Sequence, residues 1–365
     1  MSTLKTTNLQ HASAGSPAIV LASDGTATAQ LSSLNGGPLA GARNRIINGD
    51  MRISQRGTSF AAIASDTYSL DRWLWSQSGA MICTVSQSSD VPNNTFYNSY
   101  KVDVTTVDSS IAASDYALVW QRIEGFNVRD LINTTFTLSF WVKSPKTGVH
   151  CISFRNNGSD RSYIKEYTVV SANTWEYKTI TVSGGLITSG TWDWTNGSGL
   201  EILFSLATGA TFQTSADAWQ TGNYFATANQ VNVMDNTAND FFLTGVQLEP
   251  GSVATPFERR SYGQELALCQ RYYELIQDRD SVWLNSTDLY DRGWQSFKVE
   301  KRAVPTIDIV NAVTGASNSV RNVSAGTDVS GASSGATISG VAFITTSGGT
   351  ASQVARWKIT AISEL

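Results

Sequence analysis

The sequence predicts a mainly β protein: a jelly-roll β-sandwich with an extended N-terminal arm, a short helix and a second, smaller C-terminal β-sandwich domain. Residues 136–142 alternate between apolar and polar side chains, as a strand with one buried face does. Short apolar stretches of this kind recur along the chain, separated by turns rich in Gly, Asn and Ser. Alternating strands and helices, which would indicate a parallel α/β fold, do not occur, and one segment after residue 260 has a helical pattern.

Residues 1–43 form the expected N-terminal arm. The segment consists largely of Ser, Thr, Ala and Gly, with scattered single aliphatic residues. Such a segment cannot offset its own ordering entropy by burying apolar surface. We therefore expect neighbouring protein subunits to hold it, which makes it an anchor. A flexible leader is the alternative.

Residues 44–260 are expected to form the large sandwich domain. Besides 136–143, the segments 175–182, 200–206 and 241–248 have strand patterns. The alternation at 136–143 directs Phe140 to the buried face and Trp141 to the opposite face. Trp73 and Trp120 are expected in the core, because each buries a large apolar area.

A linking helix is expected over residues 261–276, followed by the smaller β domain at 277–365. Ser261 and Gln264 have the spacing of a capping box, and the apolar residues beyond them cover about half of a helical wheel. An arc that wide predicts packing against other protein. The last strand patterns are 294–299, 306–310, 337–344 and 354–362.

The charge and hydropathy of the chain exclude two classes of partner. Charged residues make up 15% of the sequence and the net charge is −4, whereas nucleic-acid binding requires clustered Lys and Arg. No apolar run approaches the roughly 20 residues that cross a bilayer. The first ten residues lack the apolar core of a secretory signal. We expect a protein that folds in a cytoplasm, without nucleic acid and without membrane insertion.

Residues for catalysis are scarce. The cysteines Cys83, Cys151 and Cys269 have no short spacing, so we expect buried thiols and no disulfide framework or zinc site. Only His11 and His150 are present, and His150 is in phase with neighbouring apolar residues, which predicts a sheet histidine. No phosphate-binding glycine motif occurs. Glycosidic cleavage needs two carboxylates at a set separation, which no sequence rule assigns here, so a hydrolase stays an alternative.

Sugar binding is the chemistry that the sequence favours. The C–H face of a pyranose packs on an aromatic ring while its hydroxyls need polar partners, and residues 190–197 (GTWDWTNG) and 217–225 (DAWQTGNYF) offer both. The two Trp of the first segment are two positions apart and share one side of an extended chain. Burial of these rings in the core is the alternative. The candidate glycan-binding residues are Trp192, Asp193, Trp194, Asn196, Trp219 and Tyr224.

Several segments resemble a family of attachment proteins from the tails of bacteriophages, common in phages of marine bacteria including cyanobacteria. These segments are 45–56 (RIINGDMRISQR), 68–73 (YSLDRW), 136–143 (FTLSFWVK), 244–251 (TGVQLEPG) and 254–273 (ATPFERRSYGQELALCQRYY). The resemblance covers about residues 44–275. It implies a jelly roll similar to carbohydrate-binding modules.

The resemblance also implies a function. It suggests a tail-fibre subunit of the virion, assembled in the cytoplasm of the bacterial host, that binds host-surface glycan without catalysis. A homotrimer is expected, attached to other tail proteins through residues 1–43. The segment Asn48-Gly49-Asp50 is similar to one in jelly rolls that carry structural calcium, and no other cofactor is expected. Two alternatives remain, a purely structural virion or adaptor protein and a polysaccharide-degrading tail protein.

Overall fold

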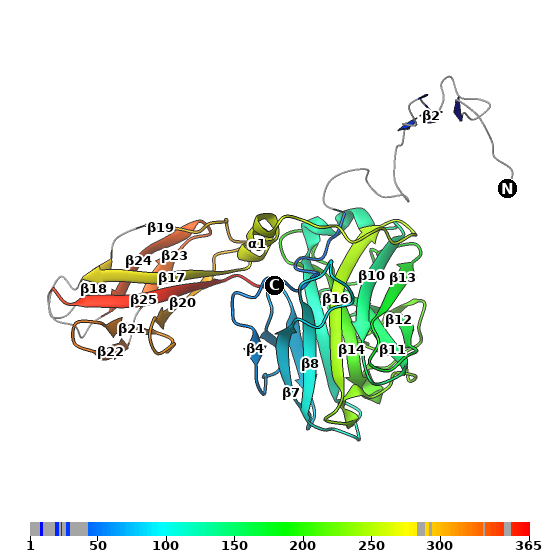
Figure 1. The fold of residues 1–365 in the computed structure, drawn as a ribbon, viewed down its shortest axis with the longest axis horizontal. Coiled ribbons are helices and arrows are strands. Elements are labelled where there is room, and N and C mark those ends of the chain that lie inside the picture. The colour runs from blue at the N-terminus through cyan, green and yellow to red at the C-terminus, as the bar shows by residue number, and fades with distance from the viewer. Residues whose placement is uncertain are drawn as a thin grey trace.

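Most of the chain folds into two β bodies joined by one helix (Figure 1). The fold was obtained as a computed structural model. It describes residues 8–9, 19–21, 23, 27–29, 43–282, 289–291, 294–330, 333–346 and 352–365.

The larger body is a sandwich of two antiparallel sheets. One sheet has the order β13 (Glu176–Val182), β10 (Phe136–Lys143), β16 (Asp240–Pro250), β8 (Ser99–Thr106), β7 (Ile82–Ser88) and β4 (Ser59–Phe60). The other has the order β15 (Trp219–Thr221), β12 (Arg161–Val169), β11 (Gly148–Arg155), β14 (Ser198–Thr208), β9 (Tyr116–Glu124), β6 (Leu74–Ser78) and β5 (Thr67–Tyr68). Four 3₁₀ turns lie in the connections: Gly125–Asn127, Arg129–Leu131, Ala210–Phe212 and Val233–Asp235.

The apolar core fills the space between these two sheets. Strand β10 alternates as predicted: Phe136 and Phe140 are fully buried in this core, and Trp141 lies on the other face. Trp73 is buried here as expected, and Trp120 is buried in a smaller cluster on the outer face of the second sheet. The three cysteines are buried thiols, as the sequence predicted. The mainly β fold class, with sheets packed as sandwiches, is confirmed.

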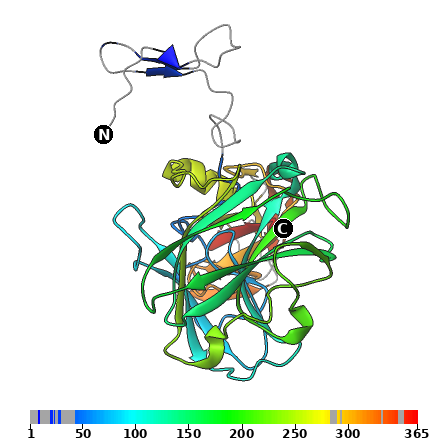
Figure 2. The ribbon, with the colours of Figure 1, turned by 90° about the vertical axis from the view of Figure 1, so that its right-hand side faces the viewer.

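The smaller body contains two antiparallel sheets. The first consists of β17 (Tyr273–Val282), β25 (Val354–Ile362), β21 (Ser319–Asn322) and β22 (Thr327–Ser330), with β20 (Thr306–Asn311) also paired to β25. The second consists of β18 (Leu289–Asp291), β24 (Gly340–Thr346), β19 (Gln295–Ser296) and β23 (Ser333–Ala336). Trp357 and Ile359 of β25 lie at the centre of its core. Figure 2 shows these orange and red strands behind the sandwich.

The helix is shorter than the sequence predicted. Helix α1 spans Tyr262–Gln270, and Ser261 and Gln264 form the expected capping box. The prediction of a helix up to residue 276 is wrong, because the chain turns at Arg271 and enters β17 at Tyr273. The cause is tertiary: Tyr273 pairs with Ile362 of β25, and the gain from this sheet outweighs the local helical pattern.

The N-terminal arm is described only in part. Three short strands, β1 (Asn8–Leu9), β2 (Ile19–Leu21) and β3 (Ala27–Ala29), form an antiparallel sheet. Apart from these strands and Ser23, residues 1–42 lie outside the described residues. The anchoring role predicted for residues 1–43 therefore stays a prediction, and His11 lies outside the described residues as well.

Buried ion pairs join the two bodies. Arg56 and Arg72 of the sandwich both pair with Glu364, which follows β25, and the Arg56 Nη2 to Glu364 Oε1 distance is 2.8 Å. The hydroxyl of Tyr272 donates to Glu124 Oε2 of β9 at 2.8 Å. Buried pairs of this kind fix geometry, because removing one partner leaves an uncompensated charge.

A second set of hydrogen bonds at the same junction uses backbone carbonyls. Arg302 donates to the carbonyls of Ser363 and Glu364 in its own body and to that of Asn196 in the sandwich, at 2.8–2.9 Å. Tyr68 donates to the carbonyl of Leu365 at 3.1 Å.

No helix in the described residues is long and apolar enough to span a membrane.

Candidate functional site

An aromatic groove lies on the outer face of the six-stranded sheet. Trp141 of β10 and Tyr177 of β13 are register partners, and their ring centroids are 5.3 Å apart. Trp141 points outward because it alternates with the buried residues Phe140 and Val142, and Tyr177, its register partner, lies on the same face of the sheet. Tyr177 is 44% exposed and Trp141 is half-buried, so each ring keeps accessible surface.

A β-bulge at Gly245 brings a third ring to the groove. The pairing of β10 with β16 shifts between Ser139 and Trp141, and Gly245 on β16 has a φ of +61°. A side chain there would meet Phe96 at 2.9 Å and Trp141 at 3.1 Å. Glycine is thus required both by its backbone angle and by the close approach of these two rings.

The segment between β16 and α1, residues 251–260, forms one wall of the groove. Its Thr255 N–H donates to Glu249 Oε1 at 2.8 Å and its Glu258 N–H donates to Gln247 Oε1 at 2.7 Å, which holds it on the outer face of the sheet. Phe257 of this segment packs edge-on against Phe96, with ring centroids 5.5 Å apart.

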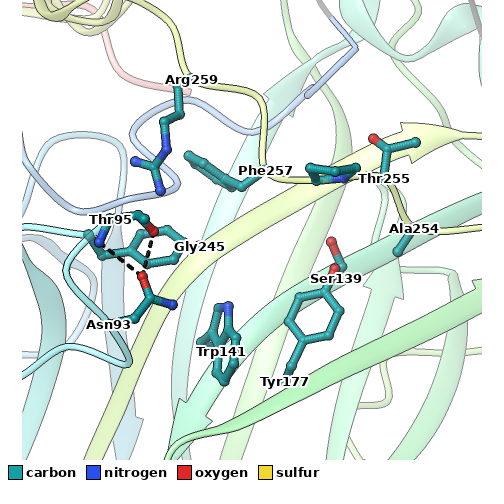
Figure 3. Close-up of a pocket in the computed structure, with 12 residues that line it drawn as sticks. Asn93, Thr95, Ser139, Trp141, Tyr177, Gly245, Ala254, Thr255, Phe257 and Arg259 are labelled. Atoms are coloured by element: carbon teal, nitrogen blue, oxygen red, sulfur yellow. Dashed lines mark hydrogen bonds between the residues drawn. The ribbon is translucent and has the colours of Figure 1, made fainter.

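These elements line a pocket of about 620 Å³ that is open to solvent (Figure 3). Its rings are Phe96, Trp141, Tyr177 and Phe257, and its uncharged polar side chains are Asn93, Thr95, Ser139 and Thr255. Arg259 is the one charged residue among its lining residues, all of which the structure describes. An apolar aromatic pocket of a few hundred Å³ with a few polar groups is the usual form of a small-molecule site.

The lining determines which chemistry the pocket can carry out. Flat rings and hydroxyl or amide groups bind a ligand with C–H faces and hydroxyls. The indole N–H of Trp141 has no hydrogen-bond partner among the described residues, so it is available as a donor. Within the described part of the chain, no three His, Cys, Asp or Glu residues gather to hold a metal ion. The aromatic rings, hydroxyl groups and amide group of the lining are the groups with which this pocket can bind a ligand.

The tryptophans predicted from the sequence come together in a different place. Trp192 and Trp194 stack on each other, with centroids 4.9 Å apart and planes 10° from parallel, and Trp219 meets Trp192 edge-on at 5.7 Å. All three pack against the main core and are half-buried. The indole N–H groups of Trp192 and Trp219 donate to the carbonyls of Ser189 and Gly185. These tryptophans thus use their ring faces and donors largely within the protein.

The other three predicted residues have structural partners. Asp193 Oδ1 accepts from the N–H and hydroxyl of Thr195, at 2.7 and 2.6 Å, and these bonds lower the pKa of Asp193. Asn196 exchanges hydrogen bonds with Arg302 across the domain junction. Tyr224 packs in a separate cluster around Cys151. The structure brings together only the three tryptophans of this set, and glycan contact at these residues stays a prediction.

The Asn48–Asp50 segment does not fit a calcium site. The side chain of Asn48 accepts from the N–H of Ile53 at 2.9 Å and donates to the carbonyls of Ile53 and Asp71. Asp50 pairs with Arg52 at 3.1 Å. The side-chain oxygens of Asn48 and Asp50 thus already have protein partners, and no group of three His, Cys, Asp or Glu residues gathers here within the described part of the chain, whereas Ca²⁺ takes six or more oxygen ligands.

Sequence reasoning found one of the four groove rings. The alternation of β10 placed Trp141 on the outer face, as the structure has it. Phe96, Phe257 and Tyr177 lie on three other segments, and nothing in their local sequence links them. The usable signal was Gly245 inside an apolar strand, which indicates a bulge or a close approach of another group.

The fold and the groove define a two-body β-sandwich protein with an aromatic pocket on one sheet. No protein-family model matches the chain, and no curated protein matches it. Among solved structures, it is similar to a family 4 carbohydrate-binding module, with a TM-score of 0.31, 13% identity, and coverage of 56% of this chain and 97% of that one.

Two further structures show similarity at the same level. One is the family 11 carbohydrate-binding module from Clostridium thermocellum in complex with a β-1,3-1,4-mixed-linked tetrasaccharide. Its TM-score is 0.31, with 13% identity and coverage of 54% of this chain and 98% of that one. The other is the enzymatically active domain of tailspike protein 4 from bacteriophage CBA120, with a TM-score of 0.28 and 16% identity. The match covers 52% of this chain and 21% of the tailspike chain.

Proposed function

We propose that the chain is a non-catalytic subunit of a bacteriophage tail, and that its aromatic groove binds glycan on the host surface. The observation that carries the proposal is the pair of outward-facing rings, Trp141 and Tyr177, at the base of a pocket of about 620 Å³. Uncharged polar groups surround these rings, and no carboxylate or histidine is among the described residues that line the pocket.

The chemistry of a sugar suits this arrangement. The C–H face of a pyranose packs on an indole or phenol ring, while its hydroxyls exchange hydrogen bonds with groups such as Thr95 and the free indole N–H of Trp141. A single groove of this size binds weakly, because binding must offset the lost freedom of the ligand. In the homotrimer that the sequence resemblance implies, linked sites would add avidity.

The role in a phage tail rests on the sequence segments that resemble phage attachment proteins. Two of these segments meet beside the groove: the N–H of Arg45 donates to the carbonyl of Leu248 at 2.9 Å, and segment 244–251 contains the bulge at Gly245. In this proposal residues 1–43 attach to other tail proteins, and the subunit is assembled in the host cytoplasm as part of the virion.

The proposal is tested by measuring glycan binding to wild type and to Trp141→Ala. Host-surface polysaccharide fragments on an array should bind wild type, and the substitution should weaken binding by about tenfold or more, since it removes the central stacking ring. Trp294→Ala is the matched control, because Trp294 is 50% exposed on the other body. Equal binding by wild type and Trp141→Ala, or loss with Trp294→Ala alone, would contradict the proposed site.

The same preparation separates the two alternatives from the sequence. Release of reducing sugar from host polysaccharide would show a polysaccharide-degrading protein. Absence of binding to every host glycan, together with normal incorporation into particles, would show a purely structural or adaptor protein. Binding without release is the outcome that we expect.

A further inference from the structure

The groove has a single charged group, and this group is unpaired. The guanidinium of Arg259 lies 4.7 Å from the ring centroid of Phe96 and 5.5 Å from that of Phe257. Figure 3 shows the side chain of Arg259 directed from the segment 251–260 toward the pocket. Within the described residues, Arg259 has no carboxylate or hydrogen-bond partner, although the whole chain has a net charge of −4.

The neighbouring arginine provides a direct contrast. Arg260 is half-buried and has protein partners throughout: it donates to the carbonyls of Ile46 and Asn44 and pairs with Glu265. Arg259 is exposed and has none of these contacts. Two successive residues of one type thus have different roles, one inside the protein and one at the pocket.

Nearby acidic groups do not neutralise Arg259. The carboxylate of Asp50 is close enough for Arg259 to lower its pKa slightly, although burial is the larger effect and raises it. Asp50 is paired with Arg52 at 3.1 Å. On the same sheet face, Lys143 is paired with Asp90. Among the charged side chains named here, Arg259 is the one that has no ion-pair partner within the described residues.

We propose that Arg259 makes the groove selective for acidic sugars, meaning glycan units with a carboxylate on the sugar ring or next to it. This inference rests on the proposed function, since it requires that the groove binds glycan. The sugar ring packs on Trp141 and Tyr177, and its carboxylate accepts hydrogen bonds from the guanidinium.

The geometry favours a carboxylate over a neutral group. A guanidinium is a planar fork of donors that matches the two oxygens of a carboxylate. The contacts with Phe96 and Phe257 restrict the side chain of Arg259, so less freedom is lost on binding. Phe96 contacts the guanidinium and also lies beside Trp141 at Gly245, so this ring connects the cation with the stacking ring.

The test compares matched glycans that differ in charge. The probes are polygalacturonate against its methyl ester and sialyllactose against lactose, titrated calorimetrically into wild type, Arg259→Gln and Arg259→Lys. Wild type should bind the acidic member of a pair about tenfold more tightly, and Arg259→Gln should bind both members equally. Arg259→Lys should keep part of the preference, because it retains the charge and loses the fork. Added salt should reduce the preference, since the site is exposed.

Arg129→Gln serves as the matched control. Arg129 is exposed on the turn Arg129–Leu131, and its substitution removes one positive charge away from the groove. Equal loss of preference in Arg129→Gln and Arg259→Gln would overturn the inference, because it would show attraction by overall charge. Neutral glycans that bind wild type as tightly as acidic ones would overturn it too, while the proposed function would stand. If Trp141→Ala leaves all binding unchanged, the proposed function itself fails.

Discussion

Two clusters of aromatic rings in the same sandwich use tryptophan in opposite ways. In the cluster of Trp192, Trp194 and Trp219, the three rings pack on one another. The indole N–H groups of Trp192 and Trp219 donate to backbone carbonyls. In the groove, Trp141 has Tyr177 beside it, an N–H without a partner among the described residues, and an accessible face. The Trp-x-Trp spacing placed two rings on one side of the chain, and the rings turned toward each other. Spacing predicts proximity, and the surrounding backbone decides which face meets the solvent.

The largest effect that would test this contrast is the removal of the stacked pair. The double substitution Trp192→Ala and Trp194→Ala should lower the free energy of unfolding by about 2–5 kcal/mol, because both rings pack on the main core. Urea denaturation measures this change. Binding of glycan by the groove should persist while the variant is folded. A stability change within about half a kcal/mol, with lost binding, would show instead that this pair is the binding surface.

The bulge at Gly245 offers a smaller effect on stability and a direct effect on the groove. Gly245→Ala should cost about 1–3 kcal/mol, through its positive φ and the contacts that its methyl group makes with Phe96 and Trp141. Glycan affinity should fall as these rings are displaced. Gly184→Ala is the control, because Gly184 also has a positive φ but nothing within 4 Å of an added methyl group. Similar stability and affinity in the two variants would show that the ring contacts at Gly245 are unimportant.

A change of pH should give the smallest effect and separate stability from binding. Burial lowers the pKa of His150, and Lys178 lowers it further, against opposing effects of the Lys146 carbonyl and Glu176. The unfolded chain, with an ordinary pKa near 6.5, then takes up a proton before the folded chain does. Stability should therefore fall as pH drops below about 6.5, until the folded-state pKa is passed.

Denaturation of wild type and His150→Gln at pH 7.5 and 5.5 measures this contribution. The loss of stability on acidification should be smaller in the variant, which has no group to protonate at this position. The lining of the groove contains no histidine or carboxylate, so binding of neutral glycan should be equal at the two pH values. An identical pH dependence in both proteins would show that His150 does not contribute.

Local pattern was enough to predict the fold class and much of its detail. The alternation in β10 and the capping box at Ser261 and Gln264 are local features, and both are present in the structure. The end of α1 was not predictable in this way, because pairing of Tyr273 with Ile362, distant in sequence, terminates the helical pattern. The groove was missed for the same reason, since β10, β13, β16 and the segment 251–260 form it only after the sheet has assembled.

The contacts beyond β25 have a mechanical consequence. Arg56 and Arg72 hold Glu364 from the sandwich side, and Arg302 holds the same stretch from the smaller body while bonding to Asn196. A load that twists one body against the other strains these bonds in parallel, so they share the force and none fails alone. We expect the two bodies to rotate as one unit, because these bonds cross the junction between them. We therefore expect torque applied to the far end of the smaller body to reorient the groove of the sandwich, because the C-terminal stretch is bonded to the sandwich at the junction.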